Sequence, residues 1–458
     1  MKKFLFALTL GLLLAAGGAA SGQETQPPRS YDVRSLGATG NTVTGAENIS
    51  VSPSFVLCNV RASGATGNGT VKDTAAFQKA LDHCVGDGGS VSVPAGKYLI
   101  GSVIIHSHTI LRLEKGATLV GSPDADDYPL IQARWEGRLR ECHRALFYAS
   151  NATDISIVGE GSIEGNAALG NLRTPRGPVL IEPVECKNVT LDGFSTKFAR
   201  LWSIHIAFCD GVVARNLTIR SDRSRSNGDG IDVDSSRRVR IEHCDIDTGD
   251  DAIALKSGRG TEGVRIGRPT EDVVITNCTL GSAFAGVAIG TELSGGIRNV
   301  VMEDCVFTSG ANSIFIKSRE DRGGIIEDIR GANLDCRATT FLVIDLLTKG
   351  IKDEEPVTGP AGLTQARALS FSNIKVNVQT LLDAHLLSAD KPLEGLSISN
   401  VTGACRRAIN LANLRNASLR DIHVTGYTGP FLTLANATGP GLDKITAPGD
   451  TFTRAPGP

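Results

Sequence analysis

A six-residue phrase that recurs along the chain limits the folds it can adopt. The phrase alternates apolar and polar residues, then ends in a small polar residue followed by an apolar residue or Cys. Copies begin at Val212, Val239, Val273, Val300, Leu369 and Leu396. The first four starts are 27, 34 and 27 residues apart, and the last two are again 27 apart.

This repeat predicts an all-β parallel β-helix. Alternation with a period of two indicates a short strand, and a repeat that holds two or three such strands is one coil of a solenoid. A single coil cannot bury its inner face, so coils must stack. A propeller blade repeats at about 40–50 residues, which is longer, and a sandwich has no reason to repeat a phrase.

A polar residue precedes the last residue of most copies and should line up at one turn of the stack. Its expected role is structural, as a ladder of side chains that satisfies turn backbone groups. The ladder includes the histidine. Its members are His243, Asn277, Asp304, Asn373 and Asn400.

One helix is expected, and it should cap the open N-terminal end of the solenoid. Asp73 is a suitable N-cap, and the glycines at 86, 88 and 89 end the helix. Ser90 then begins the first coil. The apolar residues Phe77, Ala80, Leu81 and Cys84 fall on one helical face.

The N-terminus has the order of a secretory signal peptide: two lysines, a short apolar run and small residues. We therefore assign residues 1–22 to a signal peptide, 23–57 to a linker or extra segment and 58–458 to the β-helix. The expected location is secreted or periplasmic, with no membrane span. A formal net charge of −2 gives no indication of nucleic-acid binding, and we expect a monomer.

Ten cysteines in an exported chain suggest disulfides. However, Cys244, Cys278 and Cys305 occupy one position of the repeat, and Cys is also a small buried hydrophobe. Bridges and an inward-facing stack of thiols both remain open. The spacings lack the CxxC and CxxH pairs of a zinc site.

The residues with the clearest chemistry are aspartates in two glycine-containing phrases. Asp229 and Asp232 lie in Asn227–Asp232, whereas Asp250 and Asp251 follow Gly249. The 21 residues from Asp229 to Asp250 are about one coil. Clustered carboxyl groups repel one another, which leaves a proton donor beside an ionised base. Loop aspartates more commonly cap turns or bind calcium, but the one-coil spacing, together with the family resemblance described next, favours catalysis.

The phrases Asp229–Asp232 and Gly249–Ser257 resemble glycoside hydrolase family 28, the polygalacturonase family, of bacterial type. The resemblance covers about residues 58–430. It implies a right-handed, pectin-lyase-like β-helix and inverting hydrolysis without metal or cofactor. It makes Asp250 the general acid, with Asp229 and Asp251 holding the attacking water. Inversion needs carboxyl groups about 6.5–9.5 Å apart.

Two positions depart from the family pattern. Phe284 stands where the family's Gly-His-Gly motif has His, and Phe315 stands where its Arg-Ile-Lys motif has Arg, whereas Lys317 is retained as a carboxylate contact. Loss of a bidentate Arg weakens carboxylate recognition. Phe284 and Phe315 are therefore candidates for an apolar platform under a neutral sugar such as rhamnose. Packing of the two rings on each other is the equal alternative.

Other candidates carry weaker signals. Asn227 and His205 are candidate substrate contacts, although a structural inward histidine is an equal reading of His205. An insertion with Arg134, Trp135 and Arg144 is expected to wall off one end of the cleft and favour attack at chain ends. Arg319 and Arg322 either replace the missing Arg or, as we prefer, are solvated charges.

The sequence thus predicts an exported, polygalacturonase-like glycosidase acting on pectic polysaccharide. A rhamnogalacturonan or other pectin-derived oligosaccharide hydrolase is the alternative enzyme. The alternative of another class is a β-helix that binds polysaccharide without catalysis, which has no need for three clustered carboxylates.

Overall fold

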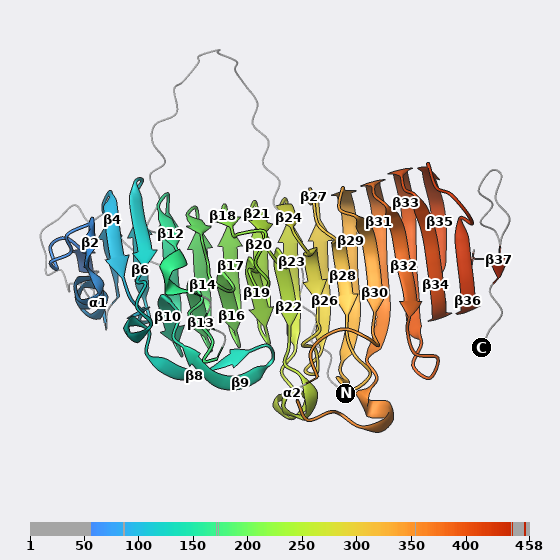
Figure 1. Cartoon of the computed structure of the whole chain (residues 1–458), viewed down its shortest axis with the longest axis horizontal. Coiled ribbons are helices and arrows are strands. Elements are labelled where there is room, and N and C mark those ends of the chain that lie inside the picture. Colours follow the sequence, from blue (N-terminus) through green and yellow to red (C-terminus); the bar gives the residue numbers. More distant parts are fainter. Residues whose placement is uncertain are drawn as a thin grey trace, which may run out of the picture. The chain divides into compact units, whose positions relative to one another are not determined.

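The computed structural model describes residues 56–440 apart from 86–87, 171, 173 and 353, together with 442 and 453–454. All of them belong to the unit Pro53–Pro458. They form a stack of coils in which each strand pairs in parallel with strands of the coils before and after it (Figure 1). The predicted parallel β-helix is confirmed. The predicted signal peptide lies outside the described residues.

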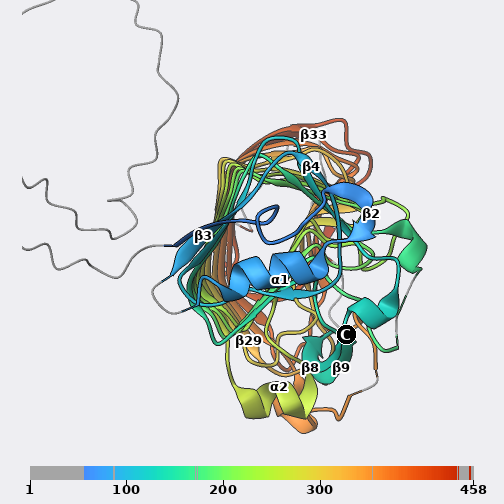
Figure 2. The same ribbon diagram turned by 90° about the vertical axis from the view of Figure 1, so that its left-hand side faces the viewer.

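Seen along the stack in Figure 2, the coils superimpose, and their strands form three faces. The repeated phrase forms the first face. Its strands are β1 (Val56–Asn59), β3 (Gly89–Val93), β6 (Thr109–Leu113), β11 (Thr153–Gly159), β14 (Lys187–Asp192), β17 (Asp210–Arg215), β20 (Arg237–Glu242), β23 (Thr270–Thr276), β26 (Ile297–Glu303), β29 (Ile325–Cys336), β31 (Gln365–Asn377), β33 (Leu393–Ala404) and β35 (Ser418–Thr425).

The second face is made of shorter strands and joins the end of β29. Its strands are β2 (Asn68–Lys72), β4 (Gly96–Ile100), β7 (Ala117–Gly121), β12 (Ser162–Glu164), β15 (Ser195–Lys197), β18 (Thr218–Arg220), β21 (Asp245–Thr248), β24 (Thr279–Ser282) and β27 (Val306–Phe307).

The third face carries the candidate site. Its strands are β5 (Val103–Ile104), β10 (Phe147–Ser150), β13 (Ile181–Val184), β16 (Ile204–Ala207), β19 (Ile231–Asp234), β22 (Ile253–Lys256), β25 (Ala285–Ile289), β28 (Asn312–Lys317), β30 (Thr340–Asp345), β32 (Thr380–Leu386), β34 (Arg407–Arg415), β36 (Leu432–Ala437) and β37 (Thr453–Arg454).

The copies of the repeated phrase lie in register, as expected. Val212 pairs with Val239, then Val273 and Val300 follow in the same column. The single interval of 34 residues arises because the short helix α2 (Gly260–Ile266) is inserted between β22 and β23. No sequence pattern had predicted this helix.

The polar residues line up at one turn, as expected, and the hydrogen bonds between them join side chains of neighbouring coils. His243, Asn277, Asp304, Asn373 and Asn400 all have φ between 53° and 57°, the left-handed region that Asn and Asp tolerate best. Asn400 Nδ2 donates to Asn373 Oδ1 at 3.1 Å, which links neighbouring coils.

All ten cysteines lie in the described part of the chain, and none forms a disulfide. Cys244, Cys278 and Cys305 are buried in the core. The Cys278 thiol approaches the Thr276 carbonyl at 3.3 Å. Of the two alternatives, the structure therefore has the inward-facing stack of thiols.

The capping helix is confirmed as α1 (Thr74–Asp82), which lies across the N-terminal end of the coils (Figure 2). Phe77, Ala80, Leu81 and Cys84 are all fully buried. Asp73 stands at the N-cap position, as expected, but its side chain makes no capping hydrogen bond to the helix. The carboxylate instead accepts from the backbone N–H groups of residues 66 and 67, at 2.7 and 3.0 Å.

The first coil begins earlier than expected. Strands β1 and β2 precede α1 and pair with β3 and β4, so the solenoid does not start at Ser90. Strand β1 starts at Val56, inside the segment assigned to the linker. Among the described residues, no helix has the length and apolar character needed to cross a membrane.

Candidate active site

The catalytic candidates come from consecutive turns that lead into the third face. Asp229 stands two residues before Ile231 of β19, and Asp251 stands two residues before Ile253 of β22. Ile231 and Ile253 pair across adjacent coils, and the Gly230 N–H donates to the Asp251 carbonyl at 3.0 Å. The expected one-coil relationship between the two phrases is therefore correct.

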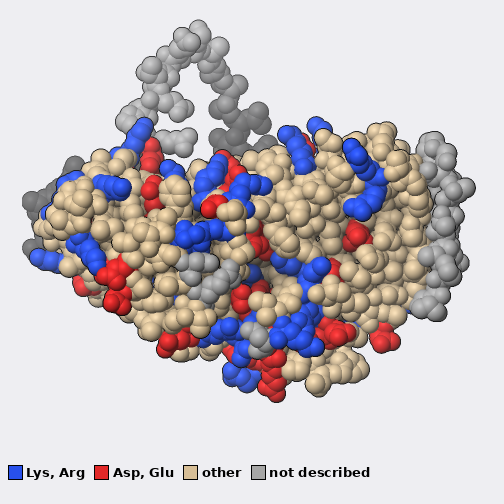
Figure 3. Space-filling model, in the orientation of Figure 1, with Lys and Arg blue, Asp and Glu red and all other residues tan. Residues whose placement is uncertain are grey.

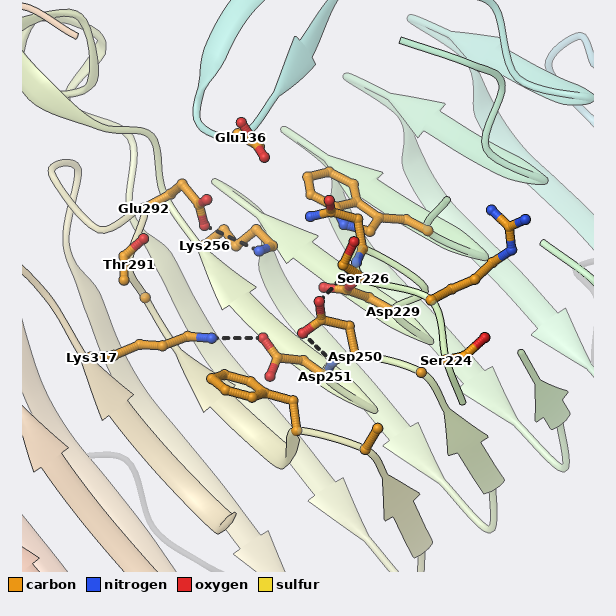
Figure 4. A pocket seen from close by; sticks show the side chains of 17 residues that line it. Glu136, Ser224, Ser226, Asp229, Asp250, Asp251, Lys256, Thr291, Glu292 and Lys317 are labelled. Atoms are coloured by element: carbon orange, nitrogen blue, oxygen red, sulfur yellow. Dashed lines mark hydrogen bonds and ion pairs between the residues drawn. The ribbon is translucent and has the colours of Figure 1, made fainter. Parts of the chain in front are cut away.

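The carboxyl groups line a cleft of about 430 Å³. Acidic and basic side chains gather around a hollow on this side of the molecule (Figure 3). Asp229, Asp250 and Asp251 lie together in the cleft, and Lys317 faces them from the next coils (Figure 4). The lining residues are Glu136, Trp202, Ser224, Arg225, Ser226, Asn227, Asp229, Gly249, Asp250, Asp251, Lys256, Ala283, Phe284, Gly290, Thr291, Glu292 and Lys317.

Backbone N–H groups fix the orientation of Asp250. The Asn227 N–H donates to Oδ2 at 2.8 Å, and the Asp251 N–H donates to Oδ1 at 3.1 Å. Two hydroxyl groups hold its main chain, since Thr248 and Ser282 donate to the Asp250 carbonyl at 2.9 and 2.6 Å. Asn227, predicted as a substrate contact, thus lines the cleft and positions Asp250 through its backbone.

Asp229 has the strongest tendency to hold a proton. Burial raises its pKa well above the ordinary value, and the nearby carboxyl groups of Asp232, Asp250 and Asp251 raise it further, against a smaller effect of Lys256. The side chain is only 3% exposed. The coupled carboxyl groups of the cluster therefore retain a shared proton, which acid–base hydrolysis can use.

Asp251 is held by Lys317. Burial raises the pKa of the Asp251 carboxyl, whereas Lys317 opposes this increase. Lys317 Nζ lies 2.9 Å from Asp251 Oδ2. The lysine that the sequence assigned to a substrate carboxylate thus already has a carboxylate partner inside the protein.

A second lysine, which sequence reasoning missed, lies beneath the cleft. Lys256 Nζ is 3.1 Å from Glu292 Oε2 and 3.5 Å from Asp232 Oδ1, and it lies 4.9 Å from the centre of the Trp202 ring. Burial raises the pKa of Asp232 to about 7, although Lys256 opposes this. The sequence signal that could have identified Lys256 is its place on β22, a strand that begins two residues after Asp251.

The long insertion forms an antiparallel hairpin of β8 (Leu130–Trp135) and β9 (Arg138–His143). Figure 1 shows it running along the lower edge of the coils to α2. At its tip, the Arg259 N–H donates to the Gly137 carbonyl at 3.2 Å. Glu136, next to Gly137, reaches the cleft from this tip (Figure 4).

The hairpin covers the third face on the N-terminal side of the catalytic coils. The rings of Trp135 and Trp202 lie 4.4 Å apart, and Arg134 Nε is 3.4 Å from Asp234 Oδ2. Both side chains of this ion pair are at most 1% exposed. Arg144 lies at the base, where its Nε donates to the Ser102 hydroxyl at 2.8 Å. The insertion therefore packs against the coils at this end, and its tip residue Glu136 lines the cleft.

His205 is not in a position to contact substrate, so that prediction is wrong. The ring is fully buried and its Nδ1 lies 2.8 Å from Glu182 Oε1. Burial lowers the pKa of His205, but the carboxylates of Asp234 and Glu182 outweigh it and raise the pKa overall. The structural reading of this histidine is the correct one.

Phe284 and Phe315 do pack on each other, with ring centres 5.7 Å apart. Phe315 is only 4% exposed, whereas Phe284 is half-buried and lines the cleft. Lys317 Nζ lies 4.7 Å from the centre of the Phe284 ring and 5.4 Å from that of Phe315. Of the two phenylalanine rings, Phe284 is thus the one that presents an apolar surface to the cleft.

Neither Arg319 nor Arg322 is a solvated charge, and neither lines the cleft. Arg322 is fully buried, and its Nε lies 2.6 Å from Glu354 Oε1. Arg319 pairs with Asp321, with Nη2 at 2.8 Å from Oδ2. The arginine in the cleft is instead Arg225, which the sequence analysis overlooked because it precedes the motif.

The fold and the site define a pectin-lyase-like parallel β-helix glycosidase with a carboxylate cluster in its cleft. Residues 88–418 match the family described as "Glycosyl hydrolases family 28". The chain belongs to this family.

Relatives named as polygalacturonases extend this comparison. A probable polygalacturonase of Vitis vinifera is 34% identical over 360 residues, which cover 74% of this chain and 72% of that protein. An exo-poly-alpha-D-galacturonosidase of Dickeya chrysanthemi is 26% identical over 348 residues, covering 64% and 58%. The solved family 28 exopolygalacturonase of Yersinia enterocolitica has the same fold, with a TM-score of 0.73, 21% identity and coverage of 84% and 78%.

Proposed function

We propose that this protein hydrolyses glycosidic bonds of pectic polysaccharide with inversion of configuration. The observation that carries the proposal is the convergence of Asp229, Asp250 and Asp251 from adjacent coils in one cleft. The names of the relatives support a pectic substrate.

Each carboxyl group has a separate role in the proposed reaction. In the substrate complex, the proton that the cluster shares is carried by Asp250 and passes to the glycosidic oxygen as the bond from the anomeric carbon to that oxygen breaks. A water held by Asp229 and Asp251 attacks the anomeric carbon from the opposite side and passes a proton to this pair. Lys317, next to Asp251, favours the ionised carboxylate that accepts this proton.

The direct test is the Asp250→Asn variant. Loss of the general acid should lower kcat by on the order of 10²–10⁴-fold while circular dichroism shows an unchanged β fold. Wild-type activity in this variant would reject the assignment. NMR of fresh wild-type product should show the anomer opposite to that of the substrate bond, whereas retention would reject the mechanism.

The position of Arg225 supports the binding of a uronate in the cleft, on the side of Asp250. It lines the cleft close to Asp250, and its Nε is buried without a hydrogen-bond partner. A guanidinium group is well matched to a carboxylate. This arginine would serve the role of the arginine that Phe315 replaces.

The hairpin supports attack at chain ends. An open cleft accepts the middle of a polymer, whereas β8 and β9 cover the coils that precede the catalytic ones. The terminal sugar would then lie beneath Glu136. Release of short products without an early fall in pectin viscosity would support this mode.

Export is the proposed route to a pectic substrate. The lysines and apolar run at residues 2–14 have the order of a signal peptide. N-terminal sequencing of protein recovered outside the cytoplasm should find cleavage near residue 22, and an uncleaved N-terminus in the cytoplasm would refute this assignment.

A further inference from the structure

A second cavity adjoins the catalytic cleft on the C-terminal side. It has a volume of about 320 Å³ and shares Phe284 with the cleft. Its other lining residues come from the third face and the loops that follow it: Asn312, Phe315, Val343, Ile344, Asp345, Lys349, Asp383, His385 and Leu386.

Strand register makes the two cavities parts of one surface. Ala254 of β22 pairs with Ala288, and Ala288 pairs with Phe315. Phe315 then pairs with Val343, and Val343 pairs with Asp383. A sugar chain over Asp251 therefore reaches the second cavity by continuing along the same face.

The lysine beside the cavity already has a partner. Lys349 Nζ lies 3.4 Å from Asp345 Oδ2. Asp345 is itself anchored, because its Oδ1 accepts from the backbone N–H groups of Leu347 and Thr348 at 3.1 and 3.0 Å. The positive charge of Lys349 thus neutralises the carboxylate of Asp345.

The other polar groups favour hydroxyl groups over a carboxylate. Asp383 Oδ1 lies 2.5 Å from His385 Nδ1 and accepts from Asn410 Nδ2 at 3.3 Å. The basic residues of the lining are Lys349 and His385, which pair with Asp345 and Asp383, and the lining contains no arginine. An anionic sugar would face like charge here, whereas hydroxyl groups can donate to Asp383.

We propose that this second cavity binds a neutral sugar unit of the substrate, with its apolar side against Phe284 and its hydroxyl groups at Asp383. The inference rests on the proposed glycosidase function and names its substrate class. The preferred substrate is a chain in which a uronate near Arg225 is followed by a neutral sugar, as in rhamnogalacturonan, rather than a uniform galacturonan.

The experiment compares two oligosaccharides of equal length, one of galacturonate alone and one alternating galacturonate with rhamnose. Wild-type kcat/KM should favour the alternating chain by about 10-fold, equivalent to about 1.4 kcal/mol. Asp383→Arg should shift the ratio about 10-fold towards galacturonan. Asp390→Arg, the same charge change at an exposed site outside the cavity, should leave the ratio unchanged.

Preference of the wild type for galacturonan, or an unchanged ratio in Asp383→Arg, would overturn the inference. If neither chain is hydrolysed, the proposed function fails. Calorimetry with the Asp250→Asn variant then still tests whether the cavity binds a neutral sugar. Tighter binding of the alternating chain, lost in Asp250→Asn/Asp383→Arg, supports the neutral-sugar site. Equal or weaker binding of that chain rejects it.

Discussion

Lys317 and Asp251 form an ion pair of 2.9 Å on the floor of the cleft, between β28 and the turn before β22. The pair joins the one cation retained from the family's Arg-Ile-Lys motif to a carboxylate of the catalytic cluster. Lys317 therefore favours the ionised form of Asp251. A role in substrate binding would require Lys317 to serve two carboxylates at once.

Lys317→Met should move the acidic limb of the pH–rate profile to higher pH. Burial raises the pKa of Asp251 and Lys317 opposes this, so removal of the cation raises that pKa further. A base with a higher pKa stays protonated, and inactive, up to a higher pH. Kinetics across pH 4–8 would measure the shift.

The alternative role of Lys317 gives a different result. If it only grips a substrate carboxylate, KM for galacturonan rises while the acidic limb stays in place. Lys375→Met, at an exposed lysine of β31, should change neither quantity.

Asp229→Asn should abolish activity yet stabilise the fold at neutral pH. The pKa of Asp229 is raised above its unfolded value, so its contribution to stability is complete below the ordinary Asp pKa of about 4 and is lost as the pH rises through the folded pKa. The neutral amide avoids this loss. Thermal unfolding should show a Tm a few degrees above wild type at pH 7, with the difference shrinking towards pH 4.

Asp421→Asn provides the comparison, because this aspartate is exposed. Its Tm should follow that of the wild type at every pH. A Tm of Asp229→Asn equal to or below that of the wild type at pH 7 would contradict the buried, proton-holding environment of Asp229.

Arg225→Ala should raise KM for uronate substrates about 10- to 100-fold, because loss of a charge-assisted hydrogen bond costs about 1.5–3 kcal/mol. Arg225→Lys should recover only part of the affinity, since an ammonium lacks the bidentate fork. Steady-state kinetics on galacturonate oligomers would measure both. Arg420→Ala, at an exposed arginine, should match the wild type, and so would Arg225→Ala if Arg225 makes no substrate contact.

The stack of coils could be predicted because it depends on local patterns. Alternation defines each strand, and the 27-residue interval places Val239 next to Val212 in the structure. The one-coil interval likewise predicted that the turns of Asp229 and Asp251 are neighbours. In a repeat fold, residues that are one repeat apart in the sequence are neighbours in space, which is uncommon in other folds.

Partners outside the repeat could not be predicted in the same way. Arg322 looked solvated from its glycine-rich surroundings, but it contacts Glu354 from a distant loop. His205 had two equal interpretations, and the structural one holds because Trp135 of the hairpin packs on Trp202, whose ring lies 5.0 Å from that of His205. Such contacts depend on how insertions fold back on the solenoid, and no periodicity in the sequence specifies that.

Trp135→Ala should loosen the hairpin and convert chain-end attack partly into internal attack. The substitution removes the contact with Trp202 at 4.4 Å and should cost about 3–5 kcal/mol within the hairpin packing. The coils that the hairpin covers would then become accessible to a polymer chain that extends beyond the cleft. Viscosity of pectin should fall at a lower extent of hydrolysis than with wild type, and longer oligomers should appear first. Leu57→Ala, at a side chain that is 79% exposed, should retain the wild-type product pattern. An unchanged pattern in Trp135→Ala, with the hairpin shown to be more accessible to protease, would mean that the hairpin does not set the mode of attack.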